Sequence, residues 1–251
     1  MRRGVKSCVP LCVPLWLLFA APWPLSAQFT THLAPATDQA FEQYRTVAES
    51  KMDWKARFAA KPGEVTIAPF GREGSLPVKD GLIHDWAAAT IARGATVEQV
   101  LGVLQDYANY KTTYAPDVAG SRLLSREGKS FRVWLRLVKK ALVPVEFDTE
   151  YEVEYRALGA GRWAMVSRST KVAELDGARE LSPGTGTGFL WRLNAYWLIE
   201  PRADGAYLEC RSISLSRDIP LGLAWAIKPV VANLPSESLR TTLESTVRGL
   251  R

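Results

Sequence analysis

Polar and apolar residues alternate with a period of two through most of the second half of the chain. Such alternation predicts strands, because successive side chains of a strand point to opposite faces of a sheet. Turns are marked by Gly128, Gly159-Ala160-Gly161 and Asp204-Gly205, and Asp-Gly between alternating runs is a strong hairpin signal. The short, sequential connections predict an antiparallel meander. The predicted strands cover residues 118–126, 130–140, 144–157, 162–175, 188–201 and 206–217.

Helical periodicity lies before this meander. Residues 36–60 form an amphipathic pattern that predicts one helix, capped near Thr37 and ended by Lys61-Pro62-Gly63. A further strand is predicted over 82–92. It is followed by the capping box Thr96-Val97-Glu98-Gln99, in which the Thr96 and Gln99 side chains can satisfy exposed backbone amides of a helix that runs to Tyr107. A second short helix is predicted near 109–114.

The C-terminal part of the chain predicts a long helix. Pro229 should kink it, because proline lacks a backbone donor and clashes with the preceding turn. Ser236 follows Pro235 and can cap a new helical segment. An apolar stripe needs a surface to bury against, and the sheet provides it. The residues expected against the sheet are Leu239, Leu243 and Val247.

The first 27 residues have the layout of a secretory signal peptide. Basic residues (Arg2, Arg3 and Lys6) precede a short apolar run at 9–20, and Ala27 allows cleavage before Gln28. The run is too short for a membrane span. We therefore expect a periplasmic or secreted protein, with an uncleaved anchor as the alternative.

Charge and cysteine content change once this segment is removed. The formal net charge is +6, and residues 1–27 hold three basic and no acidic residues, which leaves +3. This excess is too small to indicate a nucleic-acid partner. Cys8 and Cys12 lie in the segment, so Cys210 is left alone and no internal disulfide is expected.

Catalytic motifs are not evident in the sequence. It has no Gly-x-Ser-x-Gly elbow, no Gly-rich phosphate loop and no metal-spaced His/Cys set. His84 and Asp85 could move a proton as a pair, but a polar rim of the first strand is the simpler interpretation. We therefore predict no catalytic residue, no metal and no cofactor.

The order of strand, two short helices, six-stranded meander and long helix resembles the START/Bet v1-like superfamily (SRPBCC; polyketide cyclase/coenzyme Q-binding START-like domains). The chain looks similar to exported bacterial members of unassigned function. The stretches that carry the resemblance are Gly81-Leu82-Ile83-His84-Asp85-Trp86, residues 97–107 with Tyr110 and Tyr114-Ala115-Pro116-Asp117-Val118, Phe189-Leu190-Trp191-Arg192-Leu193-Asn194-Ala195-Tyr196-Trp197, and Ser214-Leu215-Ser216-Arg217-Asp218-Ile219-Pro220.

The resemblance implies an α+β helix-grip fold: a curved antiparallel sheet of about seven strands wrapped around a long, Pro-kinked C-terminal helix, with a cavity between them. Members of the superfamily carry lipids, quinones, hormones or polyketides, and some are enzymes. The implied organisation is a signal peptide at 1–27, an N-terminal helical extension and linker at 28–80, and a START-like ligand-binding domain at 81–251.

Charge distinguishes the two faces of the middle strands. The acidic residues of 144–155 share one parity, and burying them all would cost too much, so that face is solvent. Arg132 and Arg136 should lie opposite them as exposed ion pairs, and Trp134 is an aromatic residue left on the same outer face. The inner parity holds Phe131, Val133, Leu135, Leu137, Phe147, Thr149, Tyr151, Val153 and Tyr155.

The strand predicted at 188–201 cannot be divided into a polar outer face and an apolar inner face, because Arg192 and Asn194 lie among apolar residues of both parities. Two interpretations remain open. Either these groups line a cavity and orient a mostly apolar guest, or they lie on an outer face that the N-terminal helix covers, with Arg192 paired to Glu200 or Glu209.

The functional hypothesis is a binding module for a hydrophobic small molecule of the lipid, quinone or isoprenoid class. We expect a monomer, with transient membrane contact among its interactions. A cyclase/aromatase- or hydrolase-type enzyme using Arg192, Tyr196 and Glu209 is one alternative, and an interaction domain with a cavity filled by its own tryptophans is another. The candidate ligand-binding residues are Tyr151, Arg168, Trp191, Arg192, Asn194, Tyr196, Trp197, Glu209 and Trp225.

Overall fold

The computed structural model describes residues 30–70, 74–140, 144–218 and 224–250, without the side chains of 140 and 224–233. The predicted signal peptide lies outside the described residues.

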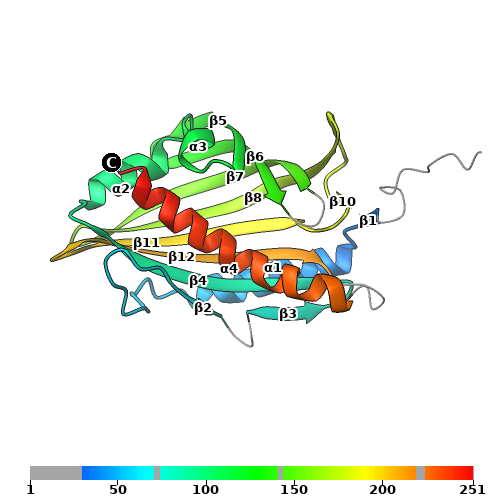
Figure 1. Ribbon diagram of the computed structural model, residues 1–251, viewed down its shortest axis with the longest axis horizontal. Coiled ribbons are helices and arrows are strands. Elements are labelled where there is room, and N and C mark those ends of the chain that lie inside the picture. The colour runs from blue at the N-terminus through cyan, green and yellow to red at the C-terminus, as the bar shows by residue number, and fades with distance from the viewer. Residues whose placement is uncertain (1–29, 71–73, 141–143, 219–223, 251) are drawn as a thin grey trace, which may run out of the picture.

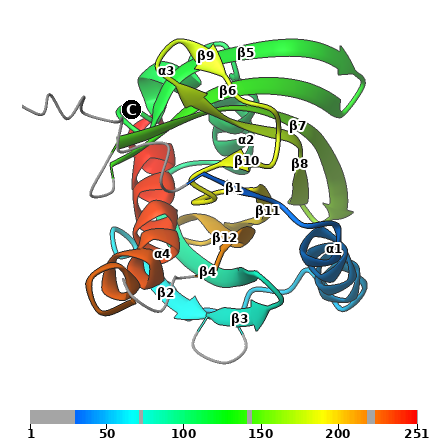
Figure 2. The same cartoon turned by 90° about the vertical axis from the view of Figure 1, so that its right-hand side faces the viewer.

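One curved antiparallel sheet organises the fold (Figures 1 and 2). Its strands follow the order β2-β4-β12-β11-β8-β7-β6-β5, while β3 pairs with β4 and β9 with β8. A separate two-stranded pair joins β1 (Thr31–His32) to β10 (Thr185–Gly186). The strands of the large sheet are β2 (Thr66–Pro69), β3 (Ser75–Val78), β4 (Gly81–Arg93), β5 (Val118–Glu127), β6 (Ser130–Lys140), β7 (Pro144–Gly159), β8 (Arg162–Asp176), β9 (Arg179–Glu180), β11 (Arg192–Arg202) and β12 (Gly205–Arg217).

The predicted meander is confirmed, with one difference in a strand boundary. β11 begins at Arg192 and not at residue 188. Gly186 and Gly188 have φ values of 132° and 74°, a left-handed backbone that interrupts an extended strand. Trp191 consequently lies just before the strand and does not follow its alternation.

Four helices complete the described structure: α1 (Pro35–Ser50), α2 (Val97–Gln105), α3 (Tyr110–Thr113) and α4 (Ala224–Arg248). The capping box of α2 is confirmed, since the Gln99 amide donates to Thr96 Oγ1 (3.3 Å) and the Thr96 amide donates to Gln99 Oε1 (2.8 Å). α4 continues through both prolines, so the prediction of a separate segment beginning at Ser236 is wrong. Within the described part of the chain, no helix is both long and apolar enough to cross a membrane.

The N-terminal helix is shorter than predicted. α1 ends at Ser50, and Trp54 has a φ of 52°, which a helix does not accommodate. The segment after it runs extended along the sheet, where Ala56, Phe58 and Ala60 pack against the cluster that contains Tyr207. The apolar pattern that predicted a longer helix therefore reflects alternate side chains facing the sheet. β2 and β3 then pair with β4, so this extension also adds strands to the main sheet.

The sheet curves around α4, and α1 lies against its other face (Figure 2). This is the helix-grip arrangement that the resemblance implied. Leu239 and Leu243 of α4 are buried in the main core, with Val247 packed against it, as predicted. A second cluster on the outer face joins Phe41 of α1 to Ile83 and Leu215. Both faces of the central strands are therefore covered.

The predicted pairing of opposite charges on the outer face is confirmed on the strands that α1 does not cover, although Asp148 is buried and not exposed as predicted. Arg136 binds Asp148 through two hydrogen bonds of 2.8 and 2.9 Å, and Arg132 pairs with Glu150 at 3.4 Å. Trp134 lies on this face with the Arg122 and Arg136 guanidinium groups 5.0 and 5.6 Å from its ring. Stacking against these cations explains an aromatic residue on a charged face.

Candidate ligand cavity

A cavity of about 270 Å³ lies between the inner face of the sheet and α4. Its wall is mostly apolar, because the inward parity of β6, β7, β8 and β11 supplies aliphatic and aromatic side chains. α4 contributes the opposite wall from Leu234 to Ser245. The side chains that form the apolar wall include Val133, Leu135, Leu137, Phe147, Tyr151, Val153, Met165 and Trp197.

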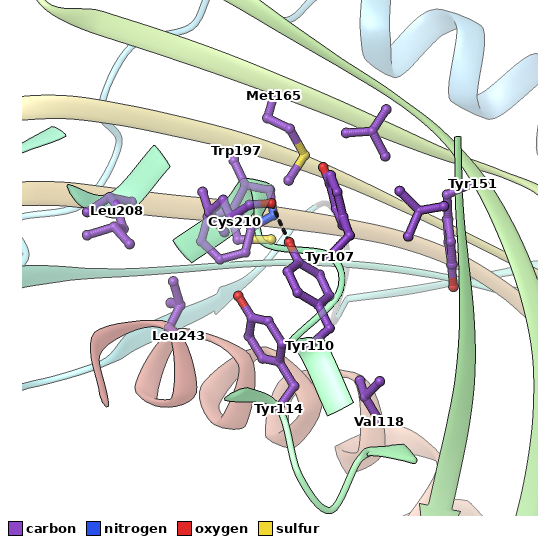
Figure 3. Packing of buried hydrophobic residues seen from close by; sticks show 14 of the residues in the cluster. Tyr107, Tyr110, Tyr114, Val118, Tyr151, Met165, Trp197, Leu208, Cys210 and Leu243 are labelled. Atoms are coloured by element: carbon purple, nitrogen blue, oxygen red, sulfur yellow. Dashed lines mark hydrogen bonds between the residues drawn. The ribbon is translucent and has the colours of Figure 1, made fainter. Parts of the chain in front are cut away.

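Three tyrosines from α2, α3 and the residues around them form part of this wall. Figure 3 shows Tyr107, Tyr110 and Tyr114 between α4 and the strands that carry Trp197 and Cys210. Their hydroxyl groups bind other protein groups: Tyr107 to Tyr155 (2.9 Å), Tyr110 to the Leu104 carbonyl (2.6 Å) and Tyr114 to Thr246 (3.0 Å). These tyrosines shape the cavity without offering it a free polar group.

Tyr151 of β7 differs from them. It lines the cavity and is 5% exposed, yet its hydroxyl has no hydrogen-bond partner. The nearby Thr149 hydroxyl donates to the Leu135 carbonyl at 2.8 Å. Burial raises the pKa of Tyr151 to about 12, while the nearby Thr149 hydroxyl, which donates to Leu135, acts to lower it. The Tyr151 hydroxyl therefore keeps its proton at neutral pH. A buried hydroxyl without a partner is costly, and a ligand oxygen could satisfy it.

His84 is a second polar group of the cavity wall. It is 3% exposed, and its ring nitrogens lie 3.3 Å from Ser75 Oγ and 3.0 Å from Ser216 Oγ. Burial lowers its pKa to about 4, so the imidazole is neutral at neutral pH. Asp85 points to the other face of β4, where it binds Arg211 at 2.8 and 2.5 Å. The interpretation of these two residues as a polar rim is therefore wrong, and they form no proton-transfer pair.

Lys139 is the one lysine among the described residues that line the cavity. It lies on the inward parity near the end of β6, and its Nζ donates to Ser238 Oγ of α4 at 2.9 Å. The side chain is partly buried, and Asp117 lines the same cavity. Burial lowers the pKa of Lys139, and the charge of Asp117 acts in the opposite direction.

Most of the predicted polar site residues lie on the other face of the sheet, outside the cavity. Arg192 Nη2 donates to Asp38 Oδ2 of α1 at 2.8 Å, and Arg168 binds Glu49 of α1 at 2.8 and 2.9 Å. Tyr196 also donates to Glu49, at 2.7 Å. Of the two interpretations of this strand, the outer face covered by the N-terminal helix is correct, although the partner of Arg192 is neither Glu200 nor Glu209.

The remaining outer-face candidates also lie outside the cavity. The buried Asn194 accepts a hydrogen bond from the Ser169 amide at 3.1 Å. Glu209 accepts from the Tyr207 hydroxyl at 2.5 Å and from the Arg57 amide at 2.9 Å. Trp191 is buried in the cluster with Phe41, away from the cavity.

The reason for this placement is electrostatic. Burial by itself raises the pKa of Glu49, but hydrogen bonds from Arg168 and Tyr196 and the charges of Arg168 and Arg45 leave it below its ordinary value. The outer face can hold these charges because α1 supplies carboxylates opposite the arginines. An apolar cavity would leave the same charges without partners, at a much larger cost.

Of the nine candidate residues, Tyr151 and Trp197 line the cavity. The Trp225 side chain lies outside the described residues. Cys210 lines the cavity as a buried thiol whose pKa is raised by burial, as expected of a small apolar residue. The sequence interpretation missed Lys139 and did not place His84 in the cavity. The parity that placed Val133, Leu135 and Leu137 inside continues to Lys139 and could have identified it.

Metal ligation finds no support in the described part of the chain, which contains no group of three or more His, Cys, Asp or Glu side chains able to hold an ion.

Comparisons with known proteins find similarity in solved structures. A STAR-related lipid transfer protein fragment from Xanthomonas axonopodis has 22% identity and a TM-score of 0.45, over 73% of this chain and 98% of that one. Human STARD10 has 12% identity and a TM-score of 0.49, over 87% and 81%. The Zhui aromatase/cyclase from Streptomyces sp. R1128 has 14% identity and a TM-score of 0.44, over 67% and 96%. No protein-family model and no curated protein sequence matches the chain.

Proposed function

We propose that this protein binds a hydrophobic small molecule, of the lipid, quinone or isoprenoid class, in the cavity between the sheet and α4, and carries or sequesters it. The observation that carries the proposal is the apolar cavity of about 270 Å³. Protein interiors are close-packed, and an apolar void of this size forfeits dispersion contacts that a guest would restore.

The size and polarity of the cavity limit the ligand. Pockets for drug-sized molecules span about 300–1,000 Å³, so a cavity of about 270 Å³ fits a small or narrow guest. The Tyr151 hydroxyl adds one hydrogen-bonding position inside the apolar wall. The supported ligand is therefore mostly apolar and carries an oxygen.

The structure gives less support to the enzyme hypothesis and to the interaction-domain hypothesis than to the ligand-binding hypothesis. The enzyme hypothesis used Arg192, Tyr196 and Glu209, and these side chains bind protein partners on the outer face. The interaction-domain hypothesis required a filled cavity, whereas the cavity bounded by Trp197 has room for a guest.

The proposal is tested by ligand recovery and by blocking the cavity. Native mass spectrometry and solvent extraction of the protein purified from its own cells should reveal a bound hydrophobic molecule. Ala195 lines the cavity, so Ala195→Trp should fill it. This variant should bind neither the natural ligand nor N-phenyl-1-naphthylamine, a neutral apolar dye. Ala119→Trp makes the same change at an exposed position of β5 and should leave both unchanged. Equal dye binding by wild type and a folded Ala195→Trp protein would reject the cavity as the site.

The proposal also includes export. It rests on the basic residues and the short apolar run within residues 1–27, followed by Ala27. N-terminal sequencing of protein from cell fractions should find Gln28 first in the periplasmic or secreted fraction. An intact Met1 on a cytoplasmic protein would reject export and leave the ligand proposal standing.

A further inference from the structure

Lys139 places a cationic group at one end of the apolar cavity. On β6 it follows Val133, Leu135 and Leu137 on the inward parity, and all four side chains line the cavity. The residue as a whole is only partly buried, but its ammonium end is largely enclosed. The stem can lie along the apolar wall while the ammonium meets Ser238 of α4.

Among the described residues, the charge of Lys139 has no direct counter-charge. Its hydrogen bond goes to the neutral Ser238 Oγ, 2.9 Å away. Within the part of the chain that the structure describes, no carboxylate lies within ion-pair distance of its Nζ, and Asp117 acts on it only from farther away. The arginines of the outer face, by contrast, bind carboxylates directly. A partly buried ammonium without such a partner favours an anion beside it.

The geometry also gives a length for the ligand. Val133 lies opposite Tyr151 in the register of β6 and β7, and Lys139 lies opposite Val145. From Val133 to Lys139 the strand advances about 20 Å. The Tyr151 and Lys139 positions therefore lie far apart along the strands that line the cavity, which suits an elongated guest.

We infer that the cavity selects an amphiphile with an anionic head, a carboxylate or a phosphate, held by Lys139 Nζ and Ser238 Oγ while its apolar tail extends toward Tyr151. The inference rests on the proposed function and specifies its ligand class. An ammonium and a hydroxyl together offer hydrogen-bond donors suited to a carboxylate or phosphate oxygen, and charge-assisted hydrogen bonds are the stronger kind.

A structural role for Lys139 is the competing explanation. The Lys139–Ser238 hydrogen bond joins β6 to α4, and it could serve only to hold the helix on the sheet. Such a role requires a donor but no charge. The two explanations therefore differ in what a neutral donor at this position should do.

The experiment compares head groups on one tail. Dodecanoate, dodecyl phosphate and dodecan-1-ol compete with N-phenyl-1-naphthylamine for wild type, Lys139→Met, Lys139→Gln and Lys129→Met. Lys129 lies outside the cavity, with its Nζ 4.6 Å from the Trp163 ring centroid, and serves as the matched control. Wild type and Lys129→Met should bind an anionic amphiphile about tenfold or more tightly than the alcohol, the effect expected of one hydrogen bond to a charged group.

Both Lys139 variants should bind the alcohol as wild type does and lose the preference for the anions to within about twofold. Whichever of dodecanoate and dodecyl phosphate binds more tightly identifies the head group, and inorganic phosphate alone should not displace the dye.

Lys139→Gln retains a donor for Ser238, so loss of selectivity with unchanged stability excludes a purely structural role. A wild type without preference for anions, or a preference that survives in Lys139→Gln, would overturn the inference while dye binding still upheld the proposed function. Failure of the dye and all three amphiphiles to bind wild type would overturn both.

Discussion

The Arg192 guanidinium of β11 donates a hydrogen bond of 2.8 Å to the Asp38 carboxylate of α1. The contact crosses the outer face of the sheet and joins residues 154 positions apart. It places a charge from the middle of an apolar strand outside the ligand cavity. Arg192 and Arg168 therefore hold α1 to the sheet. The cavity is lined mostly by apolar groups and tyrosines, with His84, Asp117 and Lys139 among its polar residues.

Arg192→Met should lower stability and leave the ligand content unchanged. Asp38 Oδ1 already lacks a hydrogen-bond partner, so removing the guanidinium leaves a partly buried carboxylate without its counter-charge. We expect a loss of about 1–2 kcal/mol in the free energy of unfolding, measured in urea. Arg179→Met, at a pair whose arginine side chain is 73% exposed, should change it by less than about 0.5 kcal/mol. Ligand loss with unchanged stability would contradict the outer-face role.

Leu243→Ala should be one of the costly substitutions in α4. Leu243 is 0% exposed in the main core, and truncating a buried leucine typically costs about 2–5 kcal/mol. Glu244→Ala, at the exposed neighbouring position, should cost within about 0.5 kcal/mol. Similar unfolding free energies for the two variants would mean that α4 does not pack on the sheet as described.

Tyr151→Phe should separate binding from stability. Its hydroxyl has no hydrogen-bond partner, so the ligand-free protein should keep or gain up to about 1 kcal/mol of stability. Tyr110→Phe removes a hydroxyl that donates to the Leu104 carbonyl at 2.6 Å and should lose about 1 kcal/mol. Affinity for an oxygen-bearing ligand should fall in Tyr151→Phe. Destabilisation of the ligand-free Tyr151→Phe protein would show that the hydroxyl already has a partner.

His84 should make stability depend on pH. Its folded-state pKa of about 4 lies below the ordinary 6.5, so between these values the unfolded chain holds a proton that the folded protein lacks. This contribution is present above pH 6.5 and is lost as the pH falls toward 4. We expect a loss of about 2 kcal/mol between pH 7.5 and pH 5. In His84→Gln this part of the pH dependence should disappear, and a wild-type profile in that variant would refute the assignment.

The sequence by itself determined the elements and much of the pairing. A period of two makes one parity of each strand apolar, and the acidic parity of β7 was predicted to face outward because burying several unpaired carboxylates is too costly. That parity does lie on the outer face, where Asp148 is buried but paired. The same logic predicted opposite charges across β6 and β7, as the Arg136–Asp148 pair confirms. It also placed Tyr151 on the inner face. The same alternation could have predicted that Lys139 faces inward, because it continues the parity of Leu137.

Only the tertiary structure decided which face of β11 meets the cavity. Parity divides a strand into two faces, but it identifies the inner one only when the other is exposed to water. β11 is covered on both faces, by α4 and by α1, so both parities are rich in buried residues. The partners of Arg192 and Arg168 lie in α1, far away in the sequence. Distant pairings of this kind arise when elements pack together, and local spacing carries no information about them.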